Sequence, residues 1–182
     1  MISAYGCAGG FKFESYSSKD PGLNLMIDYP SGWIYSEHKG GAGTYSGVVF
    51  FEDKKGDVPK ALVGLTVKDS SKTGLKSRTL EAFVEDLIAK RSKFKETKLL
   101  SKSKMKLSGA EAVILEFTYK TLDKLYSVDA KLILVREKVV VFKISDKFCT
   151  IRYENGLEAF SQFNKAFSHM LASLKFKDSQ KQ

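Results

Sequence analysis

The chain has 182 residues, of which 43% are hydrophobic and 28% are charged, and its formal net charge is +9. This composition is typical of one globular domain with a single core, and the sequence holds no run of the ~20 apolar residues that a membrane-spanning helix needs. Most of the positive charge is lysine, because arginine occurs at only four positions: Arg78, Arg91, Arg136 and Arg152. Arginine is the residue that pairs bidentately with phosphates and bases. The composition therefore argues against specific nucleic-acid recognition, and for solubility or a loose attraction to acidic proteins or anionic membranes.

A stretch without periodicity precedes the first predicted strand, and we expect residues 1–19 to form a flexible N-terminal tail. In this tail, Cys7 is close to small residues and is followed by glycines, which resembles the processing site of bacterial lipoproteins, where the cysteine becomes the lipidated first residue. The residues just before Cys7 depart from that pattern, and its lipidation requires a basic and apolar leader upstream of Met1. The alternative is an incidental thiol, and pairing with Cys149 stays open because two cysteines define neither a disulfide framework nor a zinc site.

Alternation of apolar and polar residues predicts three short strands in the first half of the chain, over residues 23–27, 48–51 and 61–67. Pro30 and Gly32 end the first of them in a turn, and we expect Trp33 to cover one end of the core. The glycine-rich segment over residues 36–47 is predicted to be a loop. It is not a phosphate-binding loop, because no Gly-Lys-Ser/Thr ending follows and no helix opens after it.

An amphipathic helix is predicted over residues 79–93, with one apolar stripe formed by Leu80, Phe83, Val84, Leu87 and Ile88. Its acidic residues lie toward the start and its basic residues toward the end, which complements the helix dipole without any catalytic role. The strand predicted next, over residues 98–107, carries four lysines on one side: Lys98, Lys102, Lys104 and Lys106. We expect this lysine row either to protect an edge strand from aggregation or to bind an anionic membrane surface electrostatically.

The clearest pattern lies over residues 111–146 and predicts an antiparallel meander of three strands, over residues 113–119, 126–134 and 139–145. A turn is expected at Arg136-Glu137-Lys138. A long second helix follows, with Asn155 as its N-cap and Glu158 completing a capping box. Its apolar stripe runs from Leu157 to Leu174, and we expect His169 to lie away from this stripe and to be exposed.

Over residues 20–176, this order of elements resembles the PsbP/Mog1/DcrB-like superfamily. We expect the remaining residues, 177–182, to form a polar tail. Four segments carry the resemblance: Leu25 to Trp33, Val49 to Asp53, Thr79 to Phe83, and Ser173 to Phe176. The resemblance implies an α+β fold in which a meander-rich antiparallel sheet is flanked by helices, as an α/β/α sandwich. Members of the superfamily include extrinsic proteins of photosystem II, a Ran-binding protein and many bacterial lipoproteins. They share no set of catalytic residues.

The sequence lacks the usual motifs of zinc peptidases, α/β-hydrolases and P-loop proteins, and His38 and His169 lie far apart. Four carboxylates are expected near one end of the sheet, where they are weak candidates for a divalent cation or else solvated loop acids: Asp28, Glu52, Asp53 and Asp57. No other cofactor is indicated.

These observations favour a non-enzymatic accessory or binding domain that acts on another protein or protein complex, tethered outside the cytoplasm through Cys7. One alternative is a cytosolic protein-binding module, like the Ran-binding branch of the superfamily. Another is a small-ligand binder or hydrolase that uses a cleft at the end of the sheet.

Overall fold

The computed structural model describes residues 10–52, 61–71, 78–122 and 131–177. Within them, the elements in chain order are β1 (Phe13–Ser17), β2 (Leu25–Pro30), β3 (Trp33–Lys39), a 3-10 turn (Gly41–Gly43), β4 (Tyr45–Glu52), β5 (Ala61–Asp69), α1 (Leu80–Arg91), β6 (Lys98–Leu107), β7 (Ala110–Leu122), β8 (Leu132–Ile144), β9 (Lys147–Gly156), α2 (Phe160–Ser173) and β10 (Lys175–Phe176).

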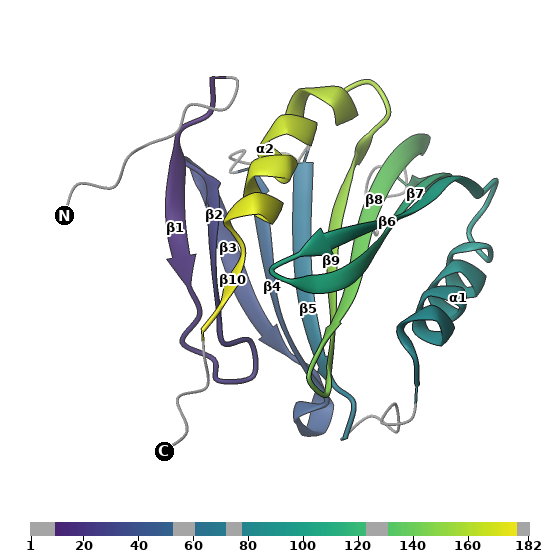
Figure 1. Cartoon of the computed structure of the whole chain (residues 1–182). Coiled ribbons are helices and arrows are strands. Elements are labelled where there is room, and N and C mark those ends of the chain that lie inside the picture. Colours follow the sequence, from purple (N-terminus) through teal and green to yellow (C-terminus); the bar gives the residue numbers. More distant parts are fainter. Residues whose placement is uncertain (1–9, 53–60, 72–77, 123–130, 178–182) are drawn as a thin grey trace, which may run out of the picture.

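The main sheet in the described part of the chain has seven antiparallel strands in the order β3-β4-β5-β9-β8-β7-β6, and a small sheet has the order β1-β2-β10. Helix α1 lies on one face of the main sheet, whereas α2 and the small sheet lie on the other (Figure 1). The predicted α+β architecture, an antiparallel sheet between helices, is therefore confirmed. The strands β6 to β9 follow one another as a meander, and β6 is an edge strand as the lysine row suggested.

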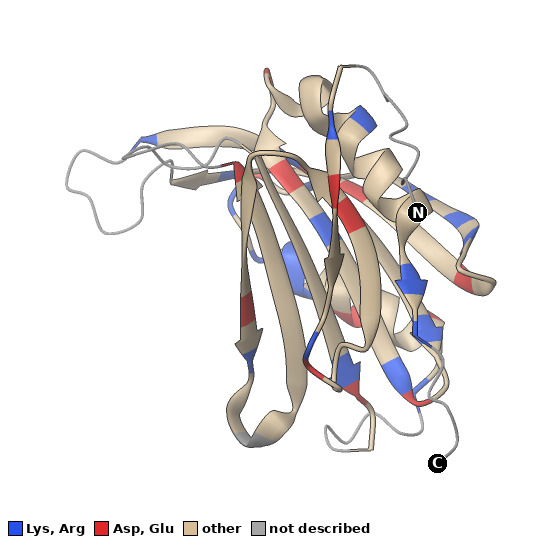
Figure 2. Cartoon of the chain, turned by 90° about the vertical axis from the view of Figure 1, so that its left-hand side faces the viewer, with Lys and Arg blue, Asp and Glu red and all other residues tan. Residues whose placement is uncertain are grey.

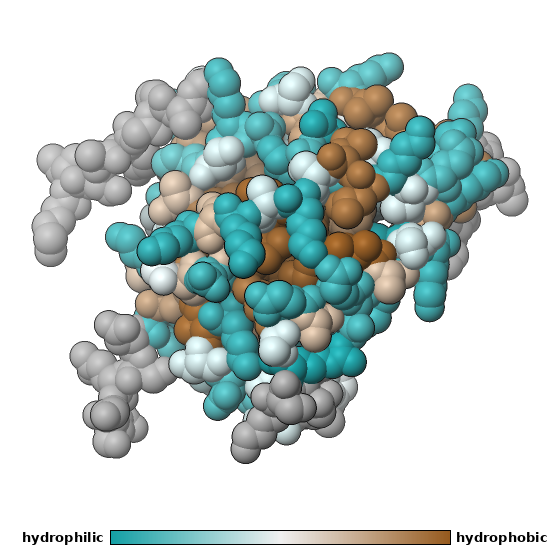
Figure 3. All heavy atoms as spheres, turned by 45° about the vertical axis from the view of Figure 1, so that its right-hand side comes forward, coloured by the Kyte–Doolittle hydropathy of each residue, from teal (hydrophilic) through white to brown (hydrophobic). Residues whose placement is uncertain are grey.

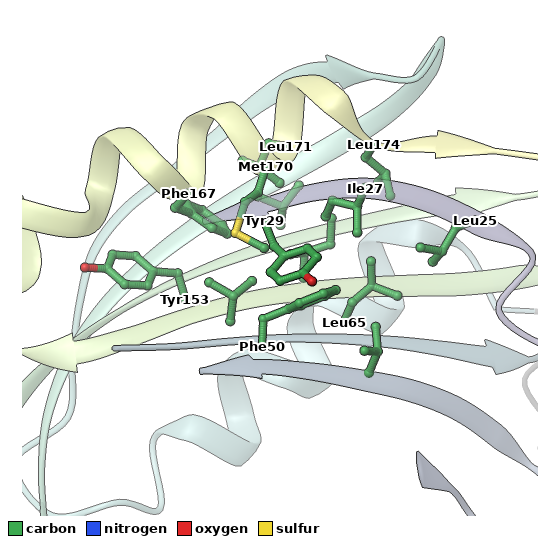
Figure 4. Close-up of a cluster of buried hydrophobic side chains, with 14 of the residues drawn as sticks. Leu25, Ile27, Tyr29, Phe50, Leu65, Tyr153, Phe167, Met170, Leu171 and Leu174 are labelled. Atoms are coloured by element: carbon green, nitrogen blue, oxygen red, sulfur yellow. The ribbon is translucent and has the colours of Figure 1, made fainter. Parts of the chain in front are cut away.

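Two apolar cores lie on the two faces of the main sheet. The larger core joins α2 and the small sheet to β4, β5 and β9, as Figure 4 shows for Ile27, Phe50, Leu65, Tyr153 and Met170. The smaller core joins α1 to β7, β8 and β9 only. Because one short helix covers only that half of the face, no helix of the described residues lies over the opposite half, which is formed by β3, β4 and β5. This difference in cover creates the groove described below.

The structure corrects the predicted boundaries within the meander. Residues 132–144 form one strand, so the turn predicted at Arg136-Glu137-Lys138 is wrong, and the third strand is β9 rather than residues 139–145. Charged residues are typical of turns, but Glu137 is fully buried and its carboxylate is bound bidentately by Arg91 of α1. The predicted strand over residues 126–134 lies partly outside the described residues.

The N-terminal region also differs from its prediction. The tail expected over residues 1–19 contains strand β1, which pairs with β2 and buries Phe13 and Tyr16. Phe13 stacks on His169 with 3.8 Å between ring centroids, so His169 is half-buried rather than exposed. At the other end of the domain, the backbone N–H of Lys177 donates to the Asn24 carbonyl at 2.9 Å, so this first residue of the predicted tail is attached to the domain.

Two further local predictions were inaccurate. The loop expected over residues 36–47 is mostly the hairpin of β3 and β4, which turns at Gly40–Thr44. The capping box at Asn155 is wrong, because Asn155 belongs to β9 and Ala159 caps α2 without a side-chain hydrogen bond. Both errors arise from polar residues in strands, where pairing with a neighbouring strand outweighs local preference. Trp33 is buried and packs against Phe163, in agreement with its predicted place in the core.

Candidate anion-binding groove

A cavity of about 430 Å³ lies between α1 and the half of the sheet that no helix covers. Its floor comes from β4, β5 and β9 and its wall from α1, and we call it the α1 groove. Figure 3, in which the α1 side of the molecule comes forward, shows apolar surface among polar side chains on that side. Residues that are adjacent in this groove are far apart in the sequence, because antiparallel pairing places side chains of neighbouring strands in rows.

One such row defines the floor of the groove. Val49 lies opposite Gly64, and Gly64 lies opposite Arg152, so these positions of β4, β5 and β9 share one face. Gly64 has no side chain, and a Cβ built there would meet only Leu62 Cδ2, at 3.9 Å. The missing side chain therefore leaves a hollow between Val49 and Arg152.

Five cationic side chains line the groove, namely Lys68, Arg78, Lys90, Arg91 and Arg152. Three of them have acidic partners. Arg78 pairs with Asp86, Arg91 pairs with Glu137, and Arg152 lies 3.4 Å from Glu137 and 3.8 Å from Glu154. These arginines are therefore largely neutralised by the protein itself.

Lys68 and Lys90 differ from the arginines, because neither forms an ion pair within the described residues. Lys68 is half-buried at the end of β5, and Lys90 is in the last turn of α1. Burial lowers the pKa of Lys68, and the nearby charge of Lys90 lowers it further. Two like charges thus line the same cavity, and Asp86, which lines it with them, is paired with Arg78 instead.

The wall of the groove is held by a buried polar network. Arg91 donates to both oxygens of Glu137, with Nε to Oε2 and Nη2 to Oε1 each at 2.7 Å, and the side chain of Glu137 is 0% exposed. Glu154 lies directly opposite Glu137 on the next strand and accepts a hydrogen bond from the hydroxyl of Tyr119 at 2.6 Å. Two adjacent carboxylates are tolerated here because Arg91 pairs with Glu137 and Arg152 lies within reach of both.

The carboxylates predicted to bind a cation are only partly described. Asp28 lies in β2, where it accepts a hydrogen bond from Ser15 and lies 3.6 Å from His169, whereas Glu52 ends β4. Asp53, Asp57 and the predicted lipidation site Cys7 lie outside the described residues. No group of three or more metal-ligating side chains occurs in the part of the chain that the structure describes, so the cation site stays a prediction.

The lysine row does not lie on one side of β6. The register of β6 and β7 shifts between Leu99 and Ser101, which places Lys98 opposite Thr118 but Lys102 opposite Leu115. Cross-strand partners share a face, so Lys98 lies on the face opposite to that of Lys102, Lys104 and Lys106. Lys102 also pairs with Glu85 of α1 at 2.6 Å. The prediction of a single lysine stripe is therefore wrong at Lys98. On the side of the small sheet, basic and acidic residues alternate over several elements (Figure 2).

Sequence reasoning did not find the α1 groove. The basic residues at the end of the predicted helix, which include Lys90, were explained by the helix dipole, and Lys68 belongs to no motif. The one available signal was Gly64, a glycine inside a strand pattern, which predicts either a bulge or a close approach to the backbone. Neither possibility identifies the partner residues.

No protein-family model and no curated protein sequence matches the chain. Solved structures do match it. The cyanobacterial PsbP protein of Synechocystis matches with a TM-score of 0.57 and 15% identity, over 97% of each chain. The Ran-binding protein Mog1p of Saccharomyces cerevisiae matches with a TM-score of 0.52 and 14% identity, over 93% of this chain and 97% of Mog1p. The chain has the PsbP/Mog1 fold.

A third protein with the PsbP/Mog1 fold is LpqN, involved in cell envelope biogenesis of Mycobacterium tuberculosis. It matches with a TM-score of 0.57 and 13% identity, over 90% of each chain. These identities are too low to transfer residues or partners, so the comparison establishes the fold alone. Neither of the helices in the described residues has the length and apolar content to cross a bilayer.

Proposed function

We propose that this protein is a non-catalytic binding domain that holds an anionic group of its partner in the α1 groove. The observation that carries the proposal is the pair Lys68 and Lys90, which face one cavity without a carboxylate partner in the described residues. A bound anion would compensate both charges, whereas in the free protein burial and mutual repulsion disfavour the charged form of Lys68.

The partner we propose is another protein or protein complex that presents an acidic group. The name of one structural neighbour, the Ran-binding protein Mog1p, is consistent with protein binding by this fold. We further propose that the domain acts outside the cytoplasm, tethered through a lipidated Cys7, with a cytosolic binding module as the alternative. The third sequence hypothesis, a cleft at the end of the sheet, has less support, because the groove lies on the face of the sheet.

The proposal is tested with acetate, the smallest carboxylate, titrated into isotope-labelled protein at constant ionic strength and followed by the amide chemical shifts. We expect saturable shifts at Lys68 and Lys90, and the loss of saturation in the Lys68→Gln/Lys90→Gln variant. The matched control is Lys104→Gln/Lys106→Gln, which removes the same charge from β6 and should bind as the wild type does. Saturation that is unchanged in the groove variant, or lost equally in both variants, would refute the groove as the site.

The pH dependence of acetate binding provides a second test, because the direction of its change is fixed by the pKa of Lys68. An ordinary lysine has a pKa of 10.5, and that of Lys68 is lowered in the free protein. A carboxylate binds the charged ammonium, so acetate binding should weaken as the pH rises toward the lowered pKa of Lys68, before an ordinary lysine titrates. In the same range the free fold should gain stability, because the unfolded chain there binds more protons than the folded one.

A further inference from the structure

We infer that the ligand of the α1 groove carries a short apolar chain next to its carboxylate, and that the hollow at Gly64 receives this chain. The inference rests on the proposed anion binding and adds to it the chemical class of the ligand. The shared chemistry is a carboxylate on a short apolar chain. It could come from a small alkyl carboxylate or from the C-terminal residue of a protein.

The apolar part of the groove supports this class. Val49 and Leu62 lie beside Gly64 on the floor, and Phe83 and Leu87 face them from α1. A simple inorganic anion would leave these surfaces in contact with water. A ligand with an apolar chain would remove them from water, which is favourable in proportion to the area buried.

The spacing along β5 sets the length of the chain. Gly64 and Lys68 are four residues apart and face the same side, which corresponds to about 13 Å along a strand. The flexible stem of Lys68 spans part of that distance, and its ammonium would hold the carboxylate together with Lys90. A chain of about four to six carbons then reaches the hollow at Gly64.

Gly64 is the specificity-determining position in this arrangement. Its backbone has no positive φ, and a Cβ there makes only an ordinary contact at 3.9 Å, so a side chain that begins at this position does not strain the strand. Valine also has a higher preference for strands than glycine. Gly64→Val would therefore fill the hollow without disturbing the fold, while Lys68 and Lys90 remain in place.

The experiment compares acetate, butanoate and hexanoate in the same chemical-shift titration. In the wild type, each added methylene should tighten binding about twofold to fourfold, since a fully buried CH₂ contributes about fourfold. In Gly64→Val this gain should disappear, so that the ratio of hexanoate affinity to acetate affinity falls toward one. The control Gly156→Ala changes another strand glycine with an open surrounding and should keep the full gain.

A wild type that binds hexanoate no tighter than acetate would overturn the inference and leave anion binding intact. A Gly64→Val variant that keeps the chain-length gain would overturn it as well. If neither acetate nor hexanoate binds, the proposed function itself fails. A last arm compares hexanoate with N-acetyl-leucine, which mimics a protein C-terminus. Tighter binding of either one supports the shared chemistry and identifies its source.

Discussion

The ion pair between Arg91 and Glu137 provides the most direct test of how this fold is held together. We expect Arg91→Met to be strongly destabilising. Methionine keeps much of the apolar stem but removes both hydrogen bonds to a carboxylate that has no exposed surface. The only other cation near Glu137 in the described residues is Arg152, at 3.4 Å.

The size of the effect follows from the burial of the remaining charge. Removal of one partner of a buried ion pair typically costs about 3–5 kcal/mol, because the other charge stays desolvated. Arg152 can compensate Glu137 in part, so we expect a loss of about 3 kcal/mol. Burial already raises the pKa of Glu137, against the lowering effect of Arg91, and loss of Arg91 should raise it further. The variant's deficit should therefore shrink as the pH falls from 7 toward 5, where protonated Glu137 needs no cation.

The measurement is urea unfolding of the wild type, Arg91→Met, Glu137→Leu and the double variant. For an m-value of about 2 kcal/mol per molar urea, the single Arg91 variant should lose about 1–2 M in midpoint. The double variant should recover at least half of that loss, because an apolar pair leaves no buried charge. A single-variant loss below about 1 kcal/mol, or a deficit that grows on acidification, would refute this account of the network.

Three further predictions concern the cores, the buried thiol and the lysine row. Phe117→Ala and Phe163→Ala should each lower the free energy of unfolding in urea by about 3–5 kcal/mol. The two losses should add, because the side chains lie in separate cores on opposite faces of the sheet, and a coupling above about 1 kcal/mol would contradict that separation. Cys149 is fully buried, and burial raises the pKa of its thiol to about 12. A thiol reagent should therefore modify it only after unfolding, and a fast reaction in the native protein would show that β9 opens. If the lysine row binds anionic vesicles, replacement of its members by Gln should weaken co-sedimentation progressively, by about 1 kcal/mol per lysine near the surface, whereas no binding at low salt would leave edge protection as its role.

Regular patterns in the sequence predicted the elements whose environment is uniform along their length. The apolar stripe of α1 and the alternation in β5 were both found, because each element turns its apolar residues toward the same side, although only Phe83 and Val84 of α1 are buried. The stripe of α2 was found for the same reason, with Phe160, Phe163 and Phe167 buried as expected. In such elements the period of the apolar residues matches the buried face, so the pattern of neighbouring residues is sufficient to predict the element.

Elements were missed where distant parts of the chain neutralise polar residues. Glu137 suggested a turn because its partner Arg91 is 46 residues away in the sequence. Strand β1 looked like a tail, since its burial depends on pairing with β2 and on stacking of Phe13 against His169. A single β-bulge placed Lys98 on the face opposite to Lys102, which no alternation rule could anticipate.

The sequence by itself therefore determined the class of this protein: a lysine-rich α+β domain with a meander, two amphipathic helices and the PsbP/Mog1 architecture. Only the tertiary structure decided where a ligand could bind. Lys68 comes from the end of β5 and Lys90 from the end of α1, and they share a cavity because α1 covers only half of its face of the sheet. Hydrophobic periodicity specifies which side of each element is buried, but the gaps between elements depend on how far each one reaches over its neighbours.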